Sequence, residues 1–585
     1  MKEHQLKHFV YIAGVSILAI LIQCLTIIVV MAWDGNGQVE NPEDVNIHFE
    51  EPEREMGSNF VKQDVAITGT ITDTNGEALP GVTVSIPGTT KGTASDLQGK
   101  YTISVPEGSV LVFSFIGFET QNIPIGDRSV IDVVLREDLE SLEEVVVVGY
   151  GTQRSQDVTG SVASITMENV ENLPVSGFDQ ALSGQIAGLQ ISTSNGIPGG
   201  GPQVQLRGVG AIGAISQPLY VVDGFALSST SNQISNPMND IAPQDIRSIT
   251  VLKDASATAI YGSRGANGVI IINTKKGSSG ETQVQVSAYS GVQVLPQRAD
   301  PNLMNAREFA TFKKESISDQ ILANTGREAT IDEIPEIYRN PELLGEGTDW
   351  FDEITQTAPI YNINVSLSGG NDKVRTYVSA GYFKQDGVVI STGYERYSIR
   401  ANVDANLGKQ LKVGINLAPT FSQRDKQITG GAGRGEQGFG EALVASPIPP
   451  VYNPDGTFNA MIQEDPGTFP YPNPLMALRE VDDQSQGIRL MSSAYAEYEI
   501  LNGLTVRSTI NADWQQGTRD FFHPSTVGYL FQFPPTIPSA TYFTSSNLNL
   551  LNENTLTYQI NFEGGHALTG LLGYNIQHEA TKSEF

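Results

Sequence analysis

Residues 361–382 read YNINVSLSGGNDKVRTYVSAGY, two runs of alternating apolar and polar residues on either side of a Gly-Gly-Asn-Asp turn. Alternation with a period of two places the apolar residues on one face of a β-strand and the polar residues on the other. Glycine-containing turns between such runs indicate antiparallel hairpins. The pattern recurs at residues 397–417, 504–514 and 556–562, so we expect a large antiparallel sheet after Gly280.

Two kinds of fold contain such strands. Strands with one apolar and one polar face are typical of transmembrane β-barrels, but a soluble sandwich shows similar alternation. Short turns at one end of the strands and long irregular stretches at the other, residues 304–350 and 423–483, favour the barrel. Residues 280–585 hold about ten candidate strands, roughly half of the 22 in plugged outer-membrane transporters. We therefore expect the chain to stop near mid-barrel. Phe585 is aromatic, as the last residue of a closing outer-membrane strand often is, but residues 580–584 lack the alternation, so we interpret this match as coincidence.

Composition excludes several functional classes. The formal net charge is −29, from 65 acidic and 36 basic residues, whereas nucleic-acid binding would require a basic surface. The single cysteine, Cys24, excludes an internal disulfide and a thiolate metal cage, and the six histidines are scattered. We expect no metal, no cofactor and no enzymatic activity. Residues 208–213 match the GxGxxG pattern, but a second strand follows in place of the helix that a dinucleotide site requires.

The N-terminal segment, residues 1–33, is expected to direct export. Lys2 and Lys7 precede an uncharged run over residues 9–33, and about 20 such residues can span a bilayer. A signal peptide cleaved after Ala32 and a permanent signal anchor both fit this run. Residues 34–63 are rich in acids and are interpreted as a solvated linker.

Residues 64–137 are expected to form a small β-sandwich. Short β-rich runs at residues 66–72, 82–86, 100–105, 110–115 and 130–135 are separated by turn signals, which is the regular spacing of a sandwich. Their sequence resembles the carboxypeptidase-regulatory-like, or transthyretin-like, module. Asp73 and Asp96 are expected to initiate turns through side-chain hydrogen bonds to the backbone, not to bind metal.

Residues 138–157 contain a second kind of strand. Val145, Val146, Val147 and Val148 lie between Glu144 and Gly149, and four β-branched residues in a row have high strand propensity. The run does not alternate, so no face is marked for burial. It is either one more strand of the sandwich or an extended segment that adds to the sheet of another protein.

Residues 158–277 mix short strands and helices and are expected to fold as an α/β domain. Ordered stretches from residue 142 to residue 277 resemble TonB-dependent outer-membrane receptors of the SusC-like class, among them 142–153, 198–201, 218–224 and 241–277. The resemblance implies that residues 158–277 are a plug filling the lumen of a barrel that begins at residue 278. It also implies a TonB box at Glu144, Val145, Val146, Val147, Val148 and Gly149. The candidate plug charges are Arg207, Asp223, Lys253, Asp254 and Arg264, expected to pair with the wall.

The complete expectation is a mainly β protein with a sandwich, an α/β plug and the first part of a transmembrane antiparallel barrel over residues 278–585. The resemblance implies active import of an oligosaccharide, or of a peptide, across the outer membrane of a Gram-negative, Bacteroidetes-like bacterium. The implied partners are TonB with its inner-membrane proton-motive complex, a SusD-like surface lipoprotein, outer-membrane lipid and a small oligomeric nutrient. Two alternatives stay open: a binding or signalling receptor without transport, and a non-functional truncated fragment.

Overall fold

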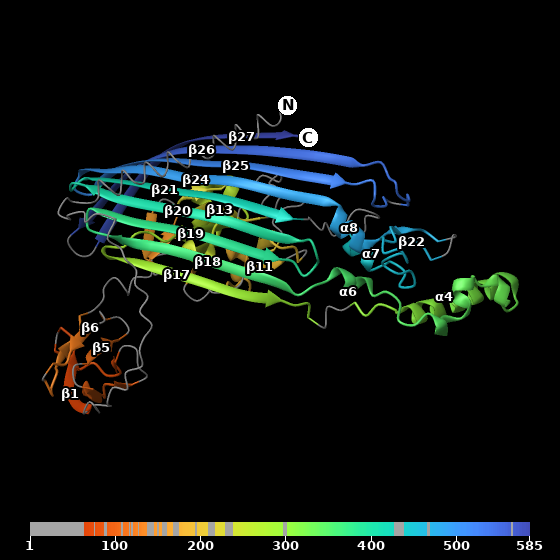
Figure 1. Ribbon diagram of the computed structural model, residues 1–585. Helices are drawn as coiled ribbons and strands as arrows, with labels where there is room; N and C mark the ends of the chain where they lie inside the picture. The colour runs from red at the N-terminus through yellow and green to blue at the C-terminus, as the bar shows by residue number, and fades with distance from the viewer. Residues whose placement is uncertain are drawn as a thin grey trace, which may run out of the picture. The chain divides into compact units, whose positions relative to one another are not determined.

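The 585-residue chain is described from a computed structural model. The structure describes residues 64–585 except 75, 87–90, 107–108, 116–117, 119–120, 127, 137–144, 149–150, 155–160, 168–174, 193–195, 209–216, 228–237, 297–300, 426–437, 465–467, 530 and 563–565. The chain separates into two compact units (Figure 1). The first unit is Met1–Val145 with Gln153–Asp157, and the second is Val146–Thr152 with Val158–Phe585.

The first unit holds the predicted sandwich, which is confirmed. One sheet has the order β4-β1-β7 and the other β3-β2-β5-β6. Buried and exposed residues alternate along β4, so Ile103 and Val105 meet Leu111 and Phe113 of the other sheet in one core. The bounds are β1 Asp64–Thr72, β2 Thr83–Ser85, β3 Gly92–Ala94, β4 Lys100–Pro106, β5 Val110–Ser114, β6 Gln121–Pro124 and β7 Val133–Val134.

The two turn aspartates of the sandwich bind backbone amides. Asp73 Oδ1 accepts the N–H of Glu77 at 2.7 Å. Asp96 Oδ1 accepts the N–H groups of Gln98 and Lys100 at 2.9 and 2.8 Å. These bonds close the turns in the way the sequence indicated.

Residues 158–277, expected from the sequence to form the plug and called the plug below, are built on a five-stranded sheet of order β10-β15-β16-β13-β14. β13 and β16 pair in parallel, and β16 pairs antiparallel with β15. Their unbroken apolar runs are buried on both faces. The bounds are β10 Val162–Thr166, β13 Leu219–Val222, β14 Phe225–Ala226, β15 Ile246–Leu252 and β16 Val269–Thr274, beside β11 Leu189–Ser192, β12 Gln203–Leu206 and the short helices α2 Phe178–Ala181, η4 Pro243–Asp245, α3 Ala255–Thr258 and η5 Ala259–Gly265.

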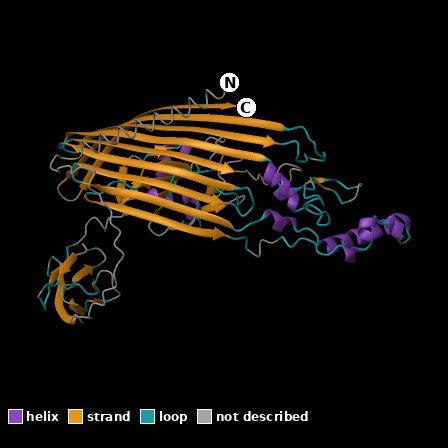
Figure 2. Ribbon diagram, in the orientation of Figure 1, coloured by secondary structure: helices purple, strands orange, loops and turns teal. Residues whose placement is uncertain are grey.

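Nine antiparallel strands follow in one sheet of order β17-β18-β19-β20-β21-β24-β25-β26-β27. Figure 2 shows them as a continuous row of long orange strands. Among the described residues, no pairing joins β17 to β27. The bounds are β17 Gly280–Gln293, β18 Ala358–Gly370, β19 Val374–Asp386, β20 Gly393–Leu407, β21 Leu411–Asp425, β24 Asp482–Leu501, β25 Leu504–His523, β26 Ser539–Phe562 and β27 His566–Glu584.

The two faces of this sheet differ as the alternation predicts. On β18 the apolar Val365 is 41% exposed, whereas its neighbour Asn364 is 4% exposed because it faces the plug. β27 continues through the polar residues 580–584, and its pairing with β26 extends to Thr544 and Glu584. The backbone hydrogen bonds between β26 and β27 stabilise that end of the strand, although it has no apolar face.

Connections at one end of the sheet are short turns, and those at the other end are long and partly helical (Figure 2). The connection from β17 to β18 carries α4 Ala306–Thr325, η7 Ile331–Glu333, α5 Glu336–Arg339, η8 Pro341–Leu343 and α6 Trp350–Ile354. The connection from β21 to β24 carries α7 Phe439–Ala442, β22 Met461–Ile462, β23 Tyr471–Pro472 and α8 Pro474–Glu480. In the described part of the chain, every helix is too short or too polar to cross a membrane.

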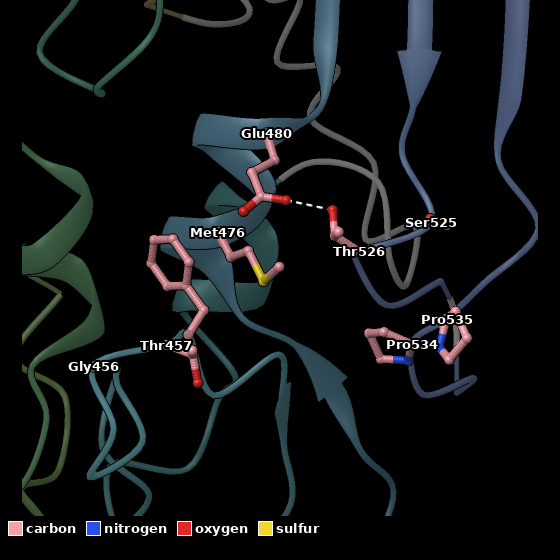
Figure 3. A pocket seen from close by; sticks show the side chains of 9 residues that line it. Gly456, Thr457, Met476, Glu480, Ser525, Thr526, Pro534 and Pro535 are labelled. Atoms are coloured by element: carbon pink, nitrogen blue, oxygen red, sulfur yellow. Dashed lines mark hydrogen bonds between the residues drawn. The ribbon is translucent and has the colours of Figure 1, made fainter.

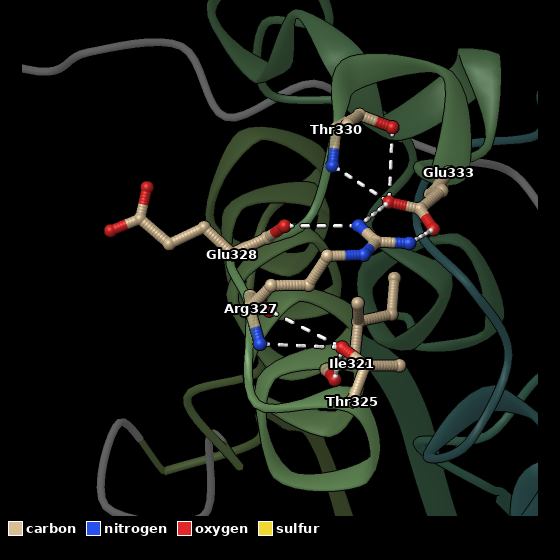
Figure 4. Close-up of polar contacts among 6 residues, drawn as sticks. All are labelled: Ile321, Thr325, Arg327, Glu328, Thr330 and Glu333. Atoms are coloured by element: carbon tan, nitrogen blue, oxygen red, sulfur yellow. Dashed lines mark hydrogen bonds and ion pairs between the residues drawn. The ribbon is translucent and has the colours of Figure 1, made fainter.

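The helical connection is fixed by local polar contacts. Asn305 and Glu308 form a capping box at the start of α4, and Gly326 ends the helix in the left-handed conformation. Arg327 then donates hydrogen bonds to both carboxylate oxygens of Glu333, at 2.8 and 2.6 Å (Figure 4). Arg327, with the amide and hydroxyl of Thr330, lowers the pKa of Glu333 to about 2. The turn after α4 is therefore defined by charge-assisted bonds.

Candidate functional site

The first candidate site is the valine strand before the plug. β8, Val145–Val148, pairs with β9, Gly151–Arg154, as a two-stranded sheet of their own. Glu144 and Gly149 lie outside the described residues. In the described part of the chain, β8 joins neither sheet of the sandwich, which disfavours the interpretation that it is one more sandwich strand. A short hairpin leaves the second backbone edge of β8 without a strand partner in the described chain.

The second candidate site is the interface between the plug and the inner face of the nine-stranded sheet, called the wall below. Figure 1 shows the plug strands lying against one side of this sheet. Many wall residues that face the plug are polar and buried, including Ser366, Ser379, Asn402 and Asn511. A few apolar wall residues, Ala418, Met491 and Leu551, pack against the core of the plug. Buried polar groups must be hydrogen-bonded, so the contacts across this interface determine how firmly the plug is held.

Arg400 of β20 forms one anchor between wall and plug. Its Nη1 lies 3.5 Å from Asp223 Oδ2, and its Nε lies 3.9 Å from Asp245 Oδ2. Tyr377 of β19 donates its hydroxyl to Asp245 Oδ1 at 3.1 Å. Asn416 of β21 donates to Asp223 Oδ2 at 2.8 Å. Three neighbouring wall strands therefore hold two plug carboxylates.

Asp223 is placed for this role by the turn between β13 and β14. Its φ of 49° belongs to the left-handed region, which aspartate adopts more readily than most residues, and Gly224 follows it. The backbone amide and the hydroxyl of Thr274 donate to its carboxylate at 2.9 and 2.7 Å. The side chain is thus oriented within the plug before it meets Arg400.

Arg489 of β24 forms a second anchor. Its Nη1 lies 3.2 Å from Asp240 Oδ2 in the plug. Its Nε and Nη2 donate to Oδ1 and Oδ2 of Asp513 on β25, at 2.8 Å each. The side chains of Arg489 and Asp240 are both 2% exposed. Removing one member of such a buried group leaves an uncompensated charge, which is strongly destabilising.

Two further wall arginines bind backbone oxygens of the plug. Arg396 of β20 donates from Nη1 to the carbonyls of Ser176 and Asn239 at 2.9 and 2.6 Å. Arg424 of β21 donates to the carbonyl of Gly199. These bonds fix plug loops whose own side chains are small or neutral.

The five plug charges singled out from the sequence divide into two groups. Asp223 contacts the wall as described, and Arg264 donates to Gln577 of β27 at 3.1 Å. Arg207, Lys253 and Asp254 contact other parts of the plug: Arg207 Nη1 lies 2.5 Å from Asp254 Oδ1, and Lys253 Nζ donates to the carbonyl of Ala187. Sequence reasoning did not single out Asp240, Asp245, Arg396, Arg489 or Asp513. For Arg396, Arg489 and Asp513 the only signal was a charge at an inward position of an alternating strand, whereas Asp240 and Asp245 lie in a turn and in η4 and carried no such signal.

A cavity of about 530 Å³ lies between two of the long connections (Figure 3). Glu480 of α8 accepts the hydroxyl of Thr526, which follows β25, and this bond joins the two connections. The lining combines apolar groups with hydroxyls and one carboxylate: Gly456, Thr457, Phe458, Met476, Glu480, Ser525, Thr526, Pro534 and Pro535. It is widely open to solvent, and its lining offers hydroxyls, one carboxylate and apolar surface.

Within the described ranges, no group of three His, Cys, Asp or Glu side chains is placed to hold a metal ion. The interface instead combines ion pairs and hydrogen bonds with a few apolar contacts between plug and wall. Contacts of this kind can hold the plug on the wall, and they can be broken without breaking a covalent bond.

Two family models match the chain. The TonB-dependent Receptor Plug Domain matches residues 154–269, and the CarboxypepD_reg-like domain matches residues 67–147. Among solved structures, the RagAB peptide importer in its open-open state has a TM-score of 0.63 and 27% identity, covering 76% of this chain and 50% of that chain. The fold of the plug and wall is therefore shared with that importer.

Curated relatives show similarity over most of the chain. TonB-dependent receptor P26 of Formosa agariphila is 36% identical over 519 residues, which cover 88% of this chain and 49% of that protein. TonB-dependent receptor SusC of Bacteroides thetaiotaomicron is 31% identical over 479 residues, or 78% of this chain and 45% of that protein. The chain thus spans about half the length of the relatives it matches. With its regulatory-like domain, plug and wall strands in this order, the chain is similar to the SusC-like TonB-dependent receptors over the part of them that it spans.

Proposed function

We propose that the protein takes part in active import of an oligomeric nutrient across the outer membrane, with energy delivered by TonB at β8. One observation carries the proposal: a short strand with an available backbone edge lies directly before a plug that buried ion pairs attach to the wall. Strand addition transmits a pull through backbone hydrogen bonds. A plug held by discrete anchors can then be rearranged without unfolding the wall.

We infer an oligosaccharide as the first candidate substrate and a peptide as the second. The family resemblance supports both, and the similarity to the RagAB peptide importer supports the peptide. The cavity beside Glu480, with its hydroxyls and apolar surfaces, supports an oligosaccharide. The proposed partners are TonB and a SusD-like surface lipoprotein, the latter placed at the end of the wall that carries the long connections.

The test is a pair of substitutions in β8. Val146→Pro with Val147→Pro removes two backbone N–H groups, so strand addition fails and uptake of labelled oligosaccharides or peptides is lost. The matched control, Val146→Thr with Val147→Thr, keeps both N–H groups and the β-branched shape and should preserve uptake. Binding of the same ligands at the cell surface should be equal in all three proteins. Normal uptake by the proline variant would refute the assignment of β8.

A further inference from the structure

We propose that the outward face of the wall binds the sugar headgroup of a glycolipid in the outer leaflet of the membrane. The site, called the amide patch below, is formed by Glu395 of β20, Gln423 and Asp425 of β21, and Gln484 and Gln486 of β24. Such a site goes beyond the proposed function, because binding there requires a wall that lies in the outer membrane but neither TonB nor a transported nutrient.

The amide patch lies on the face of the wall that points away from the plug. Side chains of successive strand residues point to opposite faces. On β21, Arg424 contacts the plug, so its neighbours Gln423 and Asp425 point outward. On β24, Arg489 contacts the plug, so the even-numbered residues of that strand point outward as well. All five patch side chains are half-buried and keep part of their surface open to a ligand.

The strand register gathers the patch from three neighbouring strands (Figure 1). Glu395 is opposed to Gln423, and Gln423 is opposed to Gln486. Asp425 is opposed to Gln484 in the next outward row. Side chains directly opposed across antiparallel strands are close enough to interact, so the five residues form one continuous polar surface.

A row of aromatic side chains lies next to the patch, on the side toward the middle of the strands. Tyr397 is two residues from Glu395, and Phe421 is two residues from Gln423. The rings of Tyr382 and Tyr397 lie 5.0 Å apart, and those of Tyr397 and Phe421 lie 6.2 Å apart. Rows of aromatic residues mark the level where lipid meets its headgroups. The amide patch therefore lies at headgroup level.

Hydrogen bonds among its own side chains orient the patch. Gln484 Nε2 and Gln423 Nε2 donate to Asp425 Oδ1 at 3.0 and 3.2 Å. Gln486 Nε2 donates to Gln484 Oε1 at 2.9 Å. Each amide is thus held by a neighbour before a ligand arrives, and ordering the site on binding costs correspondingly little entropy.

The aromatic row orients the second carboxylate of the patch. The hydroxyls of Tyr382 and Tyr397 donate to Glu395 Oε1 at 2.8 and 2.7 Å. In the described part of the chain, the other oxygens of the two carboxylates, Glu395 Oε2 and Asp425 Oδ2, accept no hydrogen bond. Two ionised acceptors therefore remain for a ligand, and hydrogen bonds to ionised acceptors are the stronger ones.

The charges of the patch favour hydroxyl groups over phosphates. The patch holds two carboxylates and no cation, and Lys384, opposed to Glu395 on β19, is paired with Asp386 at 3.9 Å. A phosphate would meet like charges, which disfavours it. A sugar offers neighbouring hydroxyls that donate to carboxylates and exchange hydrogen bonds with amides. Attachment to lipid holds that sugar at headgroup level and so raises its effective concentration at the patch.

The test removes two amides and leaves the backbone pairing intact. Gln484→Ala with Gln486→Ala is made in the whole receptor, which is purified from outer membranes in mild detergent. Mass spectrometry then measures the glycolipid bound per receptor. The variant should retain at least fivefold less glycolipid than the wild type, because it has lost two of the three amides that meet the sugar.

The matched control is Asn552→Ala with Asn554→Ala. These amides have the same spacing on one strand, and Asn554 Nδ2 donates to Asn552 Oδ1 at 2.7 Å. They lie on the outward face of β26, because Glu553 between them bonds Asn511 on the inward face, but near the short turn. The control should retain as much glycolipid as the wild type. Equal amounts in all three proteins, or a wild type that carries only phospholipid, would overturn the proposal.

A second experiment separates sugar from phosphate recognition. Delipidated wild-type receptor is titrated with glycolipid purified from the same membranes, with the same glycolipid after dephosphorylation, and with intact glycolipid in the presence of EDTA. The three dissociation constants should agree within about twofold. A tenfold weakening after dephosphorylation or in EDTA would show that phosphate is bound directly or through a divalent cation, and would overturn the assignment to sugar.

Discussion

At the scale of single residues, the interface depends on a few arginines whose partners are far away in sequence. Asp223 meets Arg400, and Asp240 meets Arg489. These side chains are nearly excluded from water, so their charges are compensated by groups inside the protein, including Asp513 beside Arg489. Arg507 is a useful contrast, since it is 43% exposed and lies 3.3 Å from Glu497.

Arg489→Ala should destabilise the protein by about 3–5 kcal/mol, because Asp240 and Asp513 are left as buried carboxylates without a counter-charge. The measurement is the free energy of urea unfolding in detergent, followed by tryptophan fluorescence. Arg507→Ala, the matched control, should cost about 1 kcal/mol or less. Equal losses in the two variants would contradict the role given to Arg489.

The hydrogen bonds that Asp254 accepts from the N–H of Ser161 and from Arg207 should weaken in acid. The N–H of Ser161, then Arg207, holds the pKa of Asp254 below its usual range. A carboxylate with a lowered pKa stabilises the folded state above its unfolded pKa of about 3.9, and this stabilisation is lost as the pH falls through the folded value. Protection of β10 amides, corrected for intrinsic exchange, should therefore fall below about pH 4 in the wild type. In Asp254→Asn it should be low throughout and lack this step.

At the scale of elements, strand length explains why the ends of the long wall strands have polar sequences. β24 and β25 have 20 residues each and β26 has 24, whereas crossing a bilayer takes about 9–11 tilted residues. The remaining residues extend beyond the lipid and need no apolar face. The same reasoning accounts for β27, whose last residues are polar and still form a strand.

A lysine scan of the outward face tests where lipid begins. Ile399 lies at the middle of β20 and is 44% exposed on the outward face. Ile399→Lys should cost about 2–4 kcal/mol, the range for a cation at the bilayer midplane. Gln484 lies near the outer end of β24, and Gln484→Lys should change stability by about 0.5 kcal/mol or less. Unfolding titrations of folded protein in vesicles measure both, and similar costs would refute the proposed lipid boundary.

At the scale of the whole molecule, local pattern predicted the elements and missed most of their contacts. The alternation of Asn364 and Val365 determined which face is buried, and the turn pairs around the sandwich strands marked their ends. Asp223 was singled out as a plug charge, but Arg400 is 177 positions further along, and no local signal joins them. The anchors follow from how the plug lies against the wall, which depends on many long-range contacts at once.

The distribution of charge between plug and wall has a consequence for exchanging parts between receptors. In the described anchors, the wall contributes Arg396, Arg400, Arg424 and Arg489, whereas the plug contributes Asp223, Asp240, Asp245 and backbone carbonyls. A plug taken from another receptor would fit this wall only if it carried acids at the same three places. The two parts must therefore change together during evolution, and chimeric receptors should be designed by transferring the anchor residues with the plug.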